Sequence, residues 1–195
     1  MKDPATDKLP TLADVERAAS RIAPYAHRTP VLTSRAIDDA LGVKVAFKCE
    51  NFQKDGAFKF RGACNAVSIL TNEEAARGVV THSSGNHAQA LALAAKMRGV
   101  PAYIVMPETA SPVKQAAVEG YGAEVILCRP TLEARETTAD EVQQRTGATF
   151  IHPYDHPHII AGQGTATLEL VEQVRELGSE LDAIIAPVGG GGLLS

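Results

Sequence analysis

Between residues 79 and 145, short apolar runs alternate with longer segments of helical periodicity, and this alternation restricts the possible folds more than any other feature. The expected strands are 79–81, 102–105 and 123–127, and the expected helices are 86–97, 112–119 and 132–145. Strands that alternate with helices of this length form βαβ units around a parallel sheet. The sequence therefore predicts an α/β fold with open parallel sheets and flanking helices.

The segments on either side add further expected elements. Thr11 stands three residues before an acidic residue, as in a capping box, and predicts a helix that stops before Pro24. Period-two alternation predicts a strand over 43–49, and a helix is expected over 156–177. Residues 181–188 are apolar almost throughout, which is typical of a strand buried on both faces.

The chain contains no low-complexity linker, so a division into two lobes has to arise where the chain crosses between them. We expect crossovers near residues 76 and 152. Residues 1–75 then form the first part of a large lobe, 76–152 a small βαβ lobe, and 153–195 the return to the large lobe. A chain of 195 residues is long enough to bury a hydrophobic core in this arrangement.

Composition excludes several classes of protein. Hydrophobic residues make up 45% and charged residues 22%, which opposes disorder, and no apolar run approaches the roughly 20 residues of a membrane span. The 19 basic and 23 acidic residues give a net charge of −4 with scattered basic positions, so neither nucleic acid nor a membrane is expected as a partner. Three isolated cysteines and no signal pattern predict a cytoplasmic location.

Four consecutive glycines, Gly189, Gly190, Gly191 and Gly192, directly follow the apolar segment 181–188. Without side chains, their backbone N–H groups can converge on an anion at the edge of a parallel sheet, which predicts a phosphate-binding loop. The alternative is a flexible turn. The spacing matches neither the GxGxxG dinucleotide motif nor a P-loop, so the phosphate is expected to belong to another cofactor.

The run Ser83-Ser84-Gly85-Asn86-His87 lies between an expected strand and an expected helix. Hydroxyls and amides at a helix N-terminus favour a carboxylate or phosphate, so this run predicts a second anion site. The alternative is plain helix capping by Ser84 or Asn86.

Lys59 stands between Phe58 and Phe60 at the expected start of a helix. Desolvation and the positive helix end both disfavour the protonated amine, and a neutral amine can form a Schiff base. A solvated helix lysine is the alternative when Lys59 is considered alone.

Taken together and in this order, the three motifs resemble the fold-type II pyridoxal-phosphate enzymes, the tryptophan-synthase-β-like family. Within this family the sequence is most similar to the serine racemase and threonine/serine dehydratase branch. The segments that carry the similarity, besides the three motifs, are 29–32, 47–53, 80–82 and 160–165. The resemblance extends from about residue 11 to the end. It implies a two-lobed fold whose large lobe is incomplete here, because a phosphate loop of this kind normally leads into a further helix.

The resemblance assigns roles to individual positions. Lys59 is implied to hold pyridoxal phosphate as a Schiff base and to remove the α-proton on its face, Phe58 to pack on the ring, and Asn86 to hydrogen-bond the ring oxygen. The glycines 189–192 are implied to hold the phosphate. The substrate carboxylate is implied to bind the group Ser83, Ser84, Gly85, Asn86, His87 and Arg135. Ser84 matches the acid/base of the opposite face in the racemase, and Arg135 is alternatively a solvated helix charge.

The resemblance implies deamination of L-threonine or L-serine to the 2-oxo acid by β-elimination, with serine racemisation as the alternative. A third reading, from another class, is a catalytically silent fragment that binds a phosphate ligand or a partner half. The family also implies a homodimer, a nucleotide effector and a divalent cation such as Mg²⁺ bound outside this chain. No metal site is expected within the chain, because His152, His156 and His158 lie in a proline-containing loop without an acidic triad.

Overall fold

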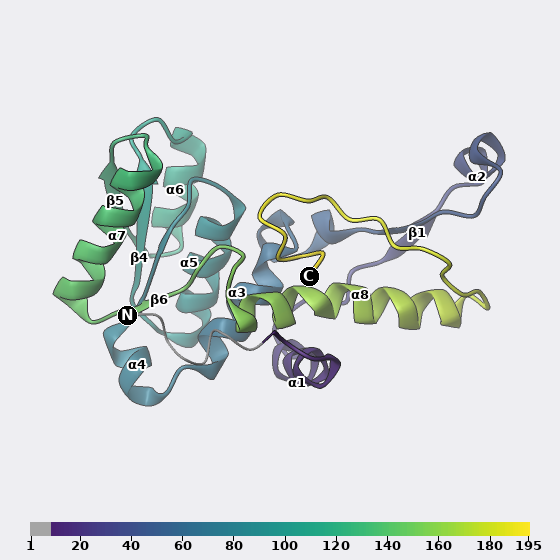
Figure 1. Cartoon of the computed structure of the whole chain (residues 1–195), viewed down its shortest axis with the longest axis horizontal. Coiled ribbons are helices and arrows are strands. Elements are labelled where there is room, and N and C mark those ends of the chain that lie inside the picture. The colour runs from purple at the N-terminus through teal and green to yellow at the C-terminus, as the bar shows by residue number, and fades with distance from the viewer. Residues whose placement is uncertain (1–8) are drawn as a thin grey trace.

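The computed structural model describes residues 9–195, and Figure 1 shows the arrangement of its elements. The helices are α1 (Leu12–Ile22), α2 (Arg35–Leu41), α3 (Lys59–Ile69), α4 (Asn72–Arg77), α5 (Asn86–Arg98), α6 (Pro112–Gly120), α7 (Leu132–Thr146) and α8 (Pro157–Glu176), with short 3-10 helices η2 (Glu50–Phe52) and η3 (Lys54–Gly56). The strands are β1 (Val31–Thr33), β2 (Ala46–Lys48), β3 (Val79–His82), β4 (Ala102–Pro107), β5 (Glu124–Cys128) and β6 (Thr149–Phe150).

Four parallel strands form the central sheet, in the order β5-β4-β3-β6. Alternate residues of these strands enter two separate cores. Val79 and Ile104 belong to the larger core, together with residues of α3 and α5. Val80 and Val105 belong to the smaller one, which includes residues of α7. Helices therefore cover both faces of the sheet, and the expected α/β fold with a parallel sheet and flanking helices is confirmed (Figure 1).

Helix α1 packs against both α3 and α8, which cross each other, whereas α2 lies away from this crossing (Figure 1). At this crossing the two backbones approach closely, because a Cβ atom on Gly162 would lie 2.6 Å from the Cα atom of Gly62. A side chain at either position would force the helices apart. Since α3 also packs on α5, it joins the sheet to α8 and α1.

The expected helix that begins after Thr11 is confirmed as α1, whose capping box joins Thr11 and Asp14. The strand expected over 43–49 is shorter than predicted: only β2 is extended, and it pairs antiparallel with β1. In the described part of the chain, no helix is long and apolar enough to cross a bilayer.

The strand predicted over 181–188 is wrong for this structure, in which these residues have no regular secondary structure. Ile185 is 97% exposed, and Ile184 and Val188 are exposed as well. A strand forms only where a neighbouring strand pairs with its backbone N–H and C=O groups, and none of the strands within residues 9–195 pairs with this segment. Apolar composition alone therefore did not determine the local structure.

We predict that Ile185→Ala changes the free energy of unfolding by less than about 0.5 kcal/mol, because the side chain is already exposed to solvent. The matched control is Ile104→Ala, which truncates a fully buried side chain and should cost about 2–5 kcal/mol. Urea denaturation of the two variants measures both values. Equal losses would show that residues 181–188 pack against the protein in solution.

Candidate active site

Lys59 is the first residue of α3, and Phe58 is the N-cap. The Lys59 Nζ atom donates a hydrogen bond to the backbone carbonyl oxygen of Pro153 at 2.7 Å and lies 5.2 Å from the centre of the Phe58 ring. Burial lowers the pKa of the Lys59 ammonium group from its ordinary value. No carboxylate within residues 9–195 forms an ion pair with it. The Lys59 amine therefore loses its proton more easily than the amine of a solvated lysine, and the neutral form is nucleophilic.

The position of α3 is fixed by Arg61, which is fully buried two residues after Lys59. Its guanidinium group binds Glu50 in a bidentate manner, with Nε and Nη2 each 2.8 Å from a carboxylate oxygen. It binds Glu169 of α8 in the same way, at 2.8 and 2.9 Å. Thr165 of α8 accepts a further hydrogen bond from Nη1 at 3.2 Å. A single side chain thus ties α3 to α8 and to η2.

Lys48 extends this buried ionic cluster. Its Nζ atom donates to Glu169 at 2.7 Å, to the side chain of Gln173 at 2.7 Å and to the carbonyl oxygen of Thr29 at 2.9 Å. Burial raises the pKa of the Glu169 carboxyl group, but the hydrogen bonds from Arg61 and Lys48 outweigh that effect, so the pKa lies below its ordinary value. The two cations and the two carboxylates therefore balance each other's charge in the buried region.

The run Ser83 to His87 joins the end of β3 to the start of α5, as expected. Gly85 is the N-cap of α5, and no side chain caps this helix. The alternative that Ser84 or Asn86 acts as a cap is therefore wrong. The Ser83 hydroxyl accepts a hydrogen bond from the Gly85 N–H at 3.3 Å, whereas the half-buried Ser84 hydroxyl has no hydrogen-bond partner within the described chain.

His87 is the second residue of α5 and is 3% exposed. Its Nε2 atom is 3.3 Å from the carbonyl oxygen of Ile151, so Nε2 carries the proton in that hydrogen bond, and Nδ1 is buried without a partner in residues 9–195. Burial first, and then the positive charge of Lys59, lower the pKa of His87 to about 3. His87 is therefore neutral at physiological pH and offers an unused hydrogen-bond acceptor inside the protein.

Arg135 lies in the first turn of α7. Its Nε atom turns back to the carbonyl oxygen of Thr131, at 3.4 Å. Its charge helps to lower the pKa of His82, although burial is the larger cause. The structure thus places Arg135 within electrostatic range of the end of β3, but no hydrogen bond joins it to the segment 83–87.

The four glycines pack against the loop that accepts the hydrogen bond from Lys59. A Cβ atom on Gly190 would lie 2.3 Å from the Tyr154 ring, and one on Gly192 would lie 2.7 Å from the Tyr154 carbonyl oxygen. Gly189 has open space where a side chain would stand, and Gly191 has a φ of +90°, a conformation that favours glycine. The fold therefore brings the glycine segment and Lys59 to the same loop, residues 153–154.

Comparison with known proteins determines the family. The sequence profile described as "Pyridoxal-phosphate dependent enzyme" matches residues 22–195, which is most of the chain. The chain belongs to this family. Its four-stranded parallel sheet with flanking helices agrees with the fold of the solved members.

Several relatives are similar over nearly the whole chain. The serine racemase of Dictyostelium discoideum is 55% identical over 185 residues, and the alignment covers 95% of this chain and 56% of that protein. The L-threo-3-hydroxyaspartate ammonia-lyase of Saccharomyces cerevisiae is 54% identical over 187 residues, covering 96% and 56%. The crystal structure of the T.th. threonine deaminase matches with a TM-score of 0.89 and 50% identity, covering 95% of this chain and 58% of that one. The chain thus spans somewhat more than half the length of these relatives.

The residues present fit pyridoxal phosphate. The cofactor requires an amine for its aldehyde and N–H donors for its phosphate. Lys59 supplies an amine whose pKa burial lowers and which no carboxylate of the described chain pairs with. The glycine segment supplies backbone N–H groups with no side chains of their own; the space beside Gly189 is open, whereas Gly190 and Gly192 pack on Tyr154. No cluster of three His, Cys, Asp or Glu side chains is placed to bind a metal within residues 9–195.

Sequence reasoning missed two parts of this site. One is the loop 153–154, which receives both Lys59 and the glycine segment; its prolines indicated only a connection. The other is the ionic cluster around Arg61. Glu169 follows Arg61 by 108 residues, and no local periodicity relates the two positions. The one available signal was an arginine directly before the small and apolar run 62–64, where a solvated charge is not expected.

We predict that His87→Gln reduces the loss of stability in acid. Between pH 6.5 and about 3 the unfolded chain binds a proton at His87 that the folded chain excludes. For this one group, the free energy of unfolding therefore falls by about 1.4 kcal/mol for each unit by which the pH decreases. This contribution is fully present above pH 6.5 and is lost as the pH falls toward 3. Urea denaturation at pH 7.5 and pH 5 checks the slope, and parallel losses in wild type and variant would contradict the assignment.

Proposed function

We propose that the chain supplies the lysine-bearing part of a pyridoxal-phosphate-dependent enzyme that racemises serine. The sequence alone gave priority to deamination and placed racemisation second. The relatives named serine racemase, including one 55% identical to this chain, support the reverse order. Because the chain spans only part of these relatives, the activity of the whole enzyme is included in the proposal.

When bound, pyridoxal phosphate withdraws electrons from the α-carbon of an amino acid and so acidifies its α-proton. We assign Lys59 as the residue that holds it and Phe58 as the residue that packs on its ring. Asn86, at the start of α5, is proposed to hydrogen-bond the ring oxygen, and the glycines 189–192 to bind the phosphate through their N–H groups.

The substrate carboxylate is proposed to bind at the N-terminal end of α5. Backbone N–H groups of this end point out of the helix without intrahelical partners, and the helix dipole favours an anion there. Ser83, Ser84, Gly85, Asn86 and His87 form this end. Arg135 is proposed to approach from α7, since its charge already acts on His82 at the neighbouring strand end.

The observation that carries the proposal is the difference between the Lys59 amine, which can take a proton, and the Ser84 hydroxyl, which can donate one. Racemisation requires a base that takes the α-proton from one face and an acid that returns a proton to the other. Lys59 is desolvated and hydrogen-bonded only to a backbone acceptor, so its amine is poised to take a proton. The Ser84 hydroxyl is half-buried at the start of α5 and has no hydrogen bond to the described residues, so it is free to donate one.

Deamination by β-elimination is the second candidate. The ammonia-lyase and threonine deaminase relatives support it, since both are about as similar to this chain as the racemases are. The outcome depends on whether a proton returns to the α-carbon before the β-hydroxyl leaves. A homodimer, a nucleotide effector and a bound divalent cation remain proposals drawn from the family resemblance.

The test follows L-serine with the complete enzyme that carries this chain and pyridoxal phosphate in D₂O. Chiral chromatography measures D-serine, and NMR measures exchange of the α-proton. We predict that Lys59→Ala abolishes both processes, because it removes the group that holds the cofactor and takes the proton. Ser84→Ala should suppress D-serine by about 100-fold or more while largely preserving exchange on the lysine face.

The matched control is Ser83→Ala, which removes the adjacent hydroxyl and should affect D-serine formation and exchange to the same extent. Equal loss of both processes in Ser84→Ala would show that Ser84 only binds substrate. Formation of the 2-oxo acid without any D-serine would support the second candidate instead.

A further inference from the structure

His152 lies in the turn that connects β6 to α8. Its Nδ1 atom accepts hydrogen bonds from two backbone N–H groups further along this turn, from Asp155 at 2.8 Å and from Tyr154 at 3.3 Å. An acceptor that binds the N–H groups of the next residues but one and but two closes the backbone into a tight turn, as the side-chain oxygen of Asn or Asp does. The imidazole ring therefore sets the path of residues 152–155.

Three neighbouring rings hold this imidazole in place. The centre of the His152 ring lies 4.6 Å from that of Tyr154, 6.1 Å from that of Phe150 and 6.3 Å from that of His82. All three contacts are close to edge-to-face, an arrangement that stabilises pairs of aromatic rings. The contacts fix the plane of the ring and therefore the direction in which Nδ1 points.

The start of the turn is anchored to the parallel sheet. Ile151 is buried, and its N–H donates a hydrogen bond to the carbonyl oxygen of Val80 at 2.8 Å. Its own carbonyl oxygen accepts a hydrogen bond from the Thr81 hydroxyl at 2.7 Å and lies 3.3 Å from Nε2 of His87. His152 thus begins its turn from a fixed point beside β3 and α5.

The middle of the turn meets the proposed cofactor site. The Pro153 carbonyl oxygen accepts the hydrogen bond from the Lys59 Nζ atom, and Tyr154 packs against Gly190 and Gly192. A proline ring fixes φ, so only the rotation ψ of Pro153 is left to direct its carbonyl group. The two hydrogen bonds that His152 accepts restrict this rotation, because they close the turn on the C-terminal side of Pro153.

We propose that His152 is a positioning residue for Lys59: its Nδ1 atom holds the Pro153 carbonyl group against the Lys59 amine and keeps this amine partly shielded from water. The inference rests on the proposed role of Lys59, but it concerns the state of the amine before a cofactor binds. It requires an acceptor at the position of Nδ1 and makes no demand on Nε2.

This role requires a neutral imidazole, because Nδ1 accepts a hydrogen bond only while it carries no proton. Burial lowers the pKa of His152 from its ordinary value, and the charges of His82 and Lys59 act in the same direction, whereas Asp155 and Glu136 raise it. The ring is therefore neutral at physiological pH, with its proton on Nε2, and the turn remains closed.

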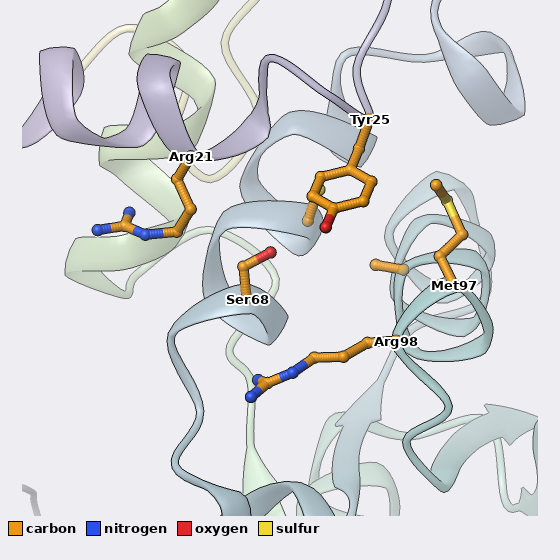
Figure 2. Close-up of a pocket in the computed structure, with 7 residues that line it drawn as sticks. Arg21, Tyr25, Ser68, Met97 and Arg98 are labelled. Carbon is orange, nitrogen blue, oxygen red and sulfur yellow. The ribbon is translucent and has the colours of Figure 1, made fainter.

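Two substitutions separate the two ring nitrogens. In His152→Asn the side-chain oxygen takes the place of Nδ1 as the acceptor, whereas in His152→Gln it reaches the position of Nε2. His152→Ala removes the acceptor and the ring together. The matched control is Ser68→Ala, later on the same helix as Lys59, where the side chain lines a separate pocket between α1, α3 and α5 (Figure 2).

The measurement is competitive labelling of lysines with acetic anhydride in the complete enzyme that carries this chain, after removal of any cofactor. The extent of labelling at Lys59 as a function of pH gives the pKa of its amine. We predict that this pKa rises toward that of a solvated lysine in His152→Gln and His152→Ala, because a loosened turn reduces the burial that lowers it. In His152→Asn and Ser68→Ala it should stay at the wild-type value.

Cofactor binding gives a second readout. The affinity for pyridoxal phosphate, measured by absorbance titration, should fall about tenfold in His152→Gln and His152→Ala and less than about twofold in His152→Asn.

An unchanged pKa of Lys59 in either His152→Gln or His152→Ala would overturn the proposal. An equal rise in His152→Asn would overturn it as well, because the ring rather than the Nδ1 acceptor would then be required. The proposed function fails in a different way, since borohydride reduction of the wild-type enzyme with pyridoxal phosphate would leave Lys59 unlabelled.

Discussion

The arrangement of the site depends on one buried guanidinium group. Arg61 has no exposed surface, and moving its charge from water into the protein is costly unless carboxylates and acceptors surround it. Glu50 and Glu169 each bind it through two hydrogen bonds. The carboxylates come from η2 and α8, so the need to neutralise Arg61 fixes these elements relative to α3. Loss of either carboxylate would leave an uncompensated buried charge, at a cost of about 3–5 kcal/mol.

Lys59 and Arg61 stand two residues apart on α3 but differ in chemical state. Lys48 and Arg61 engage Glu169, and Arg61 engages Glu50, so these two carboxylates are already bound. Lys59 is half-buried and donates to a backbone carbonyl in place of a carboxylate. Burial lowers its pKa without an opposing ion pair, whereas hydrogen bonds to Glu50 and Glu169 raise the pKa of Arg61 despite burial. The pKa values of two cations that lie two residues apart on one helix are therefore shifted in opposite directions.

Much of this fold was predictable from the sequence, because its signals are local. Helices α5, α6 and α7 and strands β3, β4 and β5 follow directly from the periodicity of residues 79–145. Lys59 and the segment 83–87 lie at helix starts, where the motifs indicated. The roles of these residues remain predictions. The failures are non-local: 181–188 is apolar enough for a strand but has no neighbouring strand within the described chain, and Arg61 meets Glu169 only because α3 crosses α8.

The central claim is that Lys59 is the amine that this fold prepares for pyridoxal phosphate. The most direct measurement treats the chain with the cofactor, reduces the adduct with borohydride and maps the pyridoxyl group by peptide mass spectrometry. The account predicts the label on Lys59, since Lys48 is held by Glu169 and Lys54 lies over the Phe60 ring. A label on Lys48 or Lys54, with Lys59 unmodified, would contradict it.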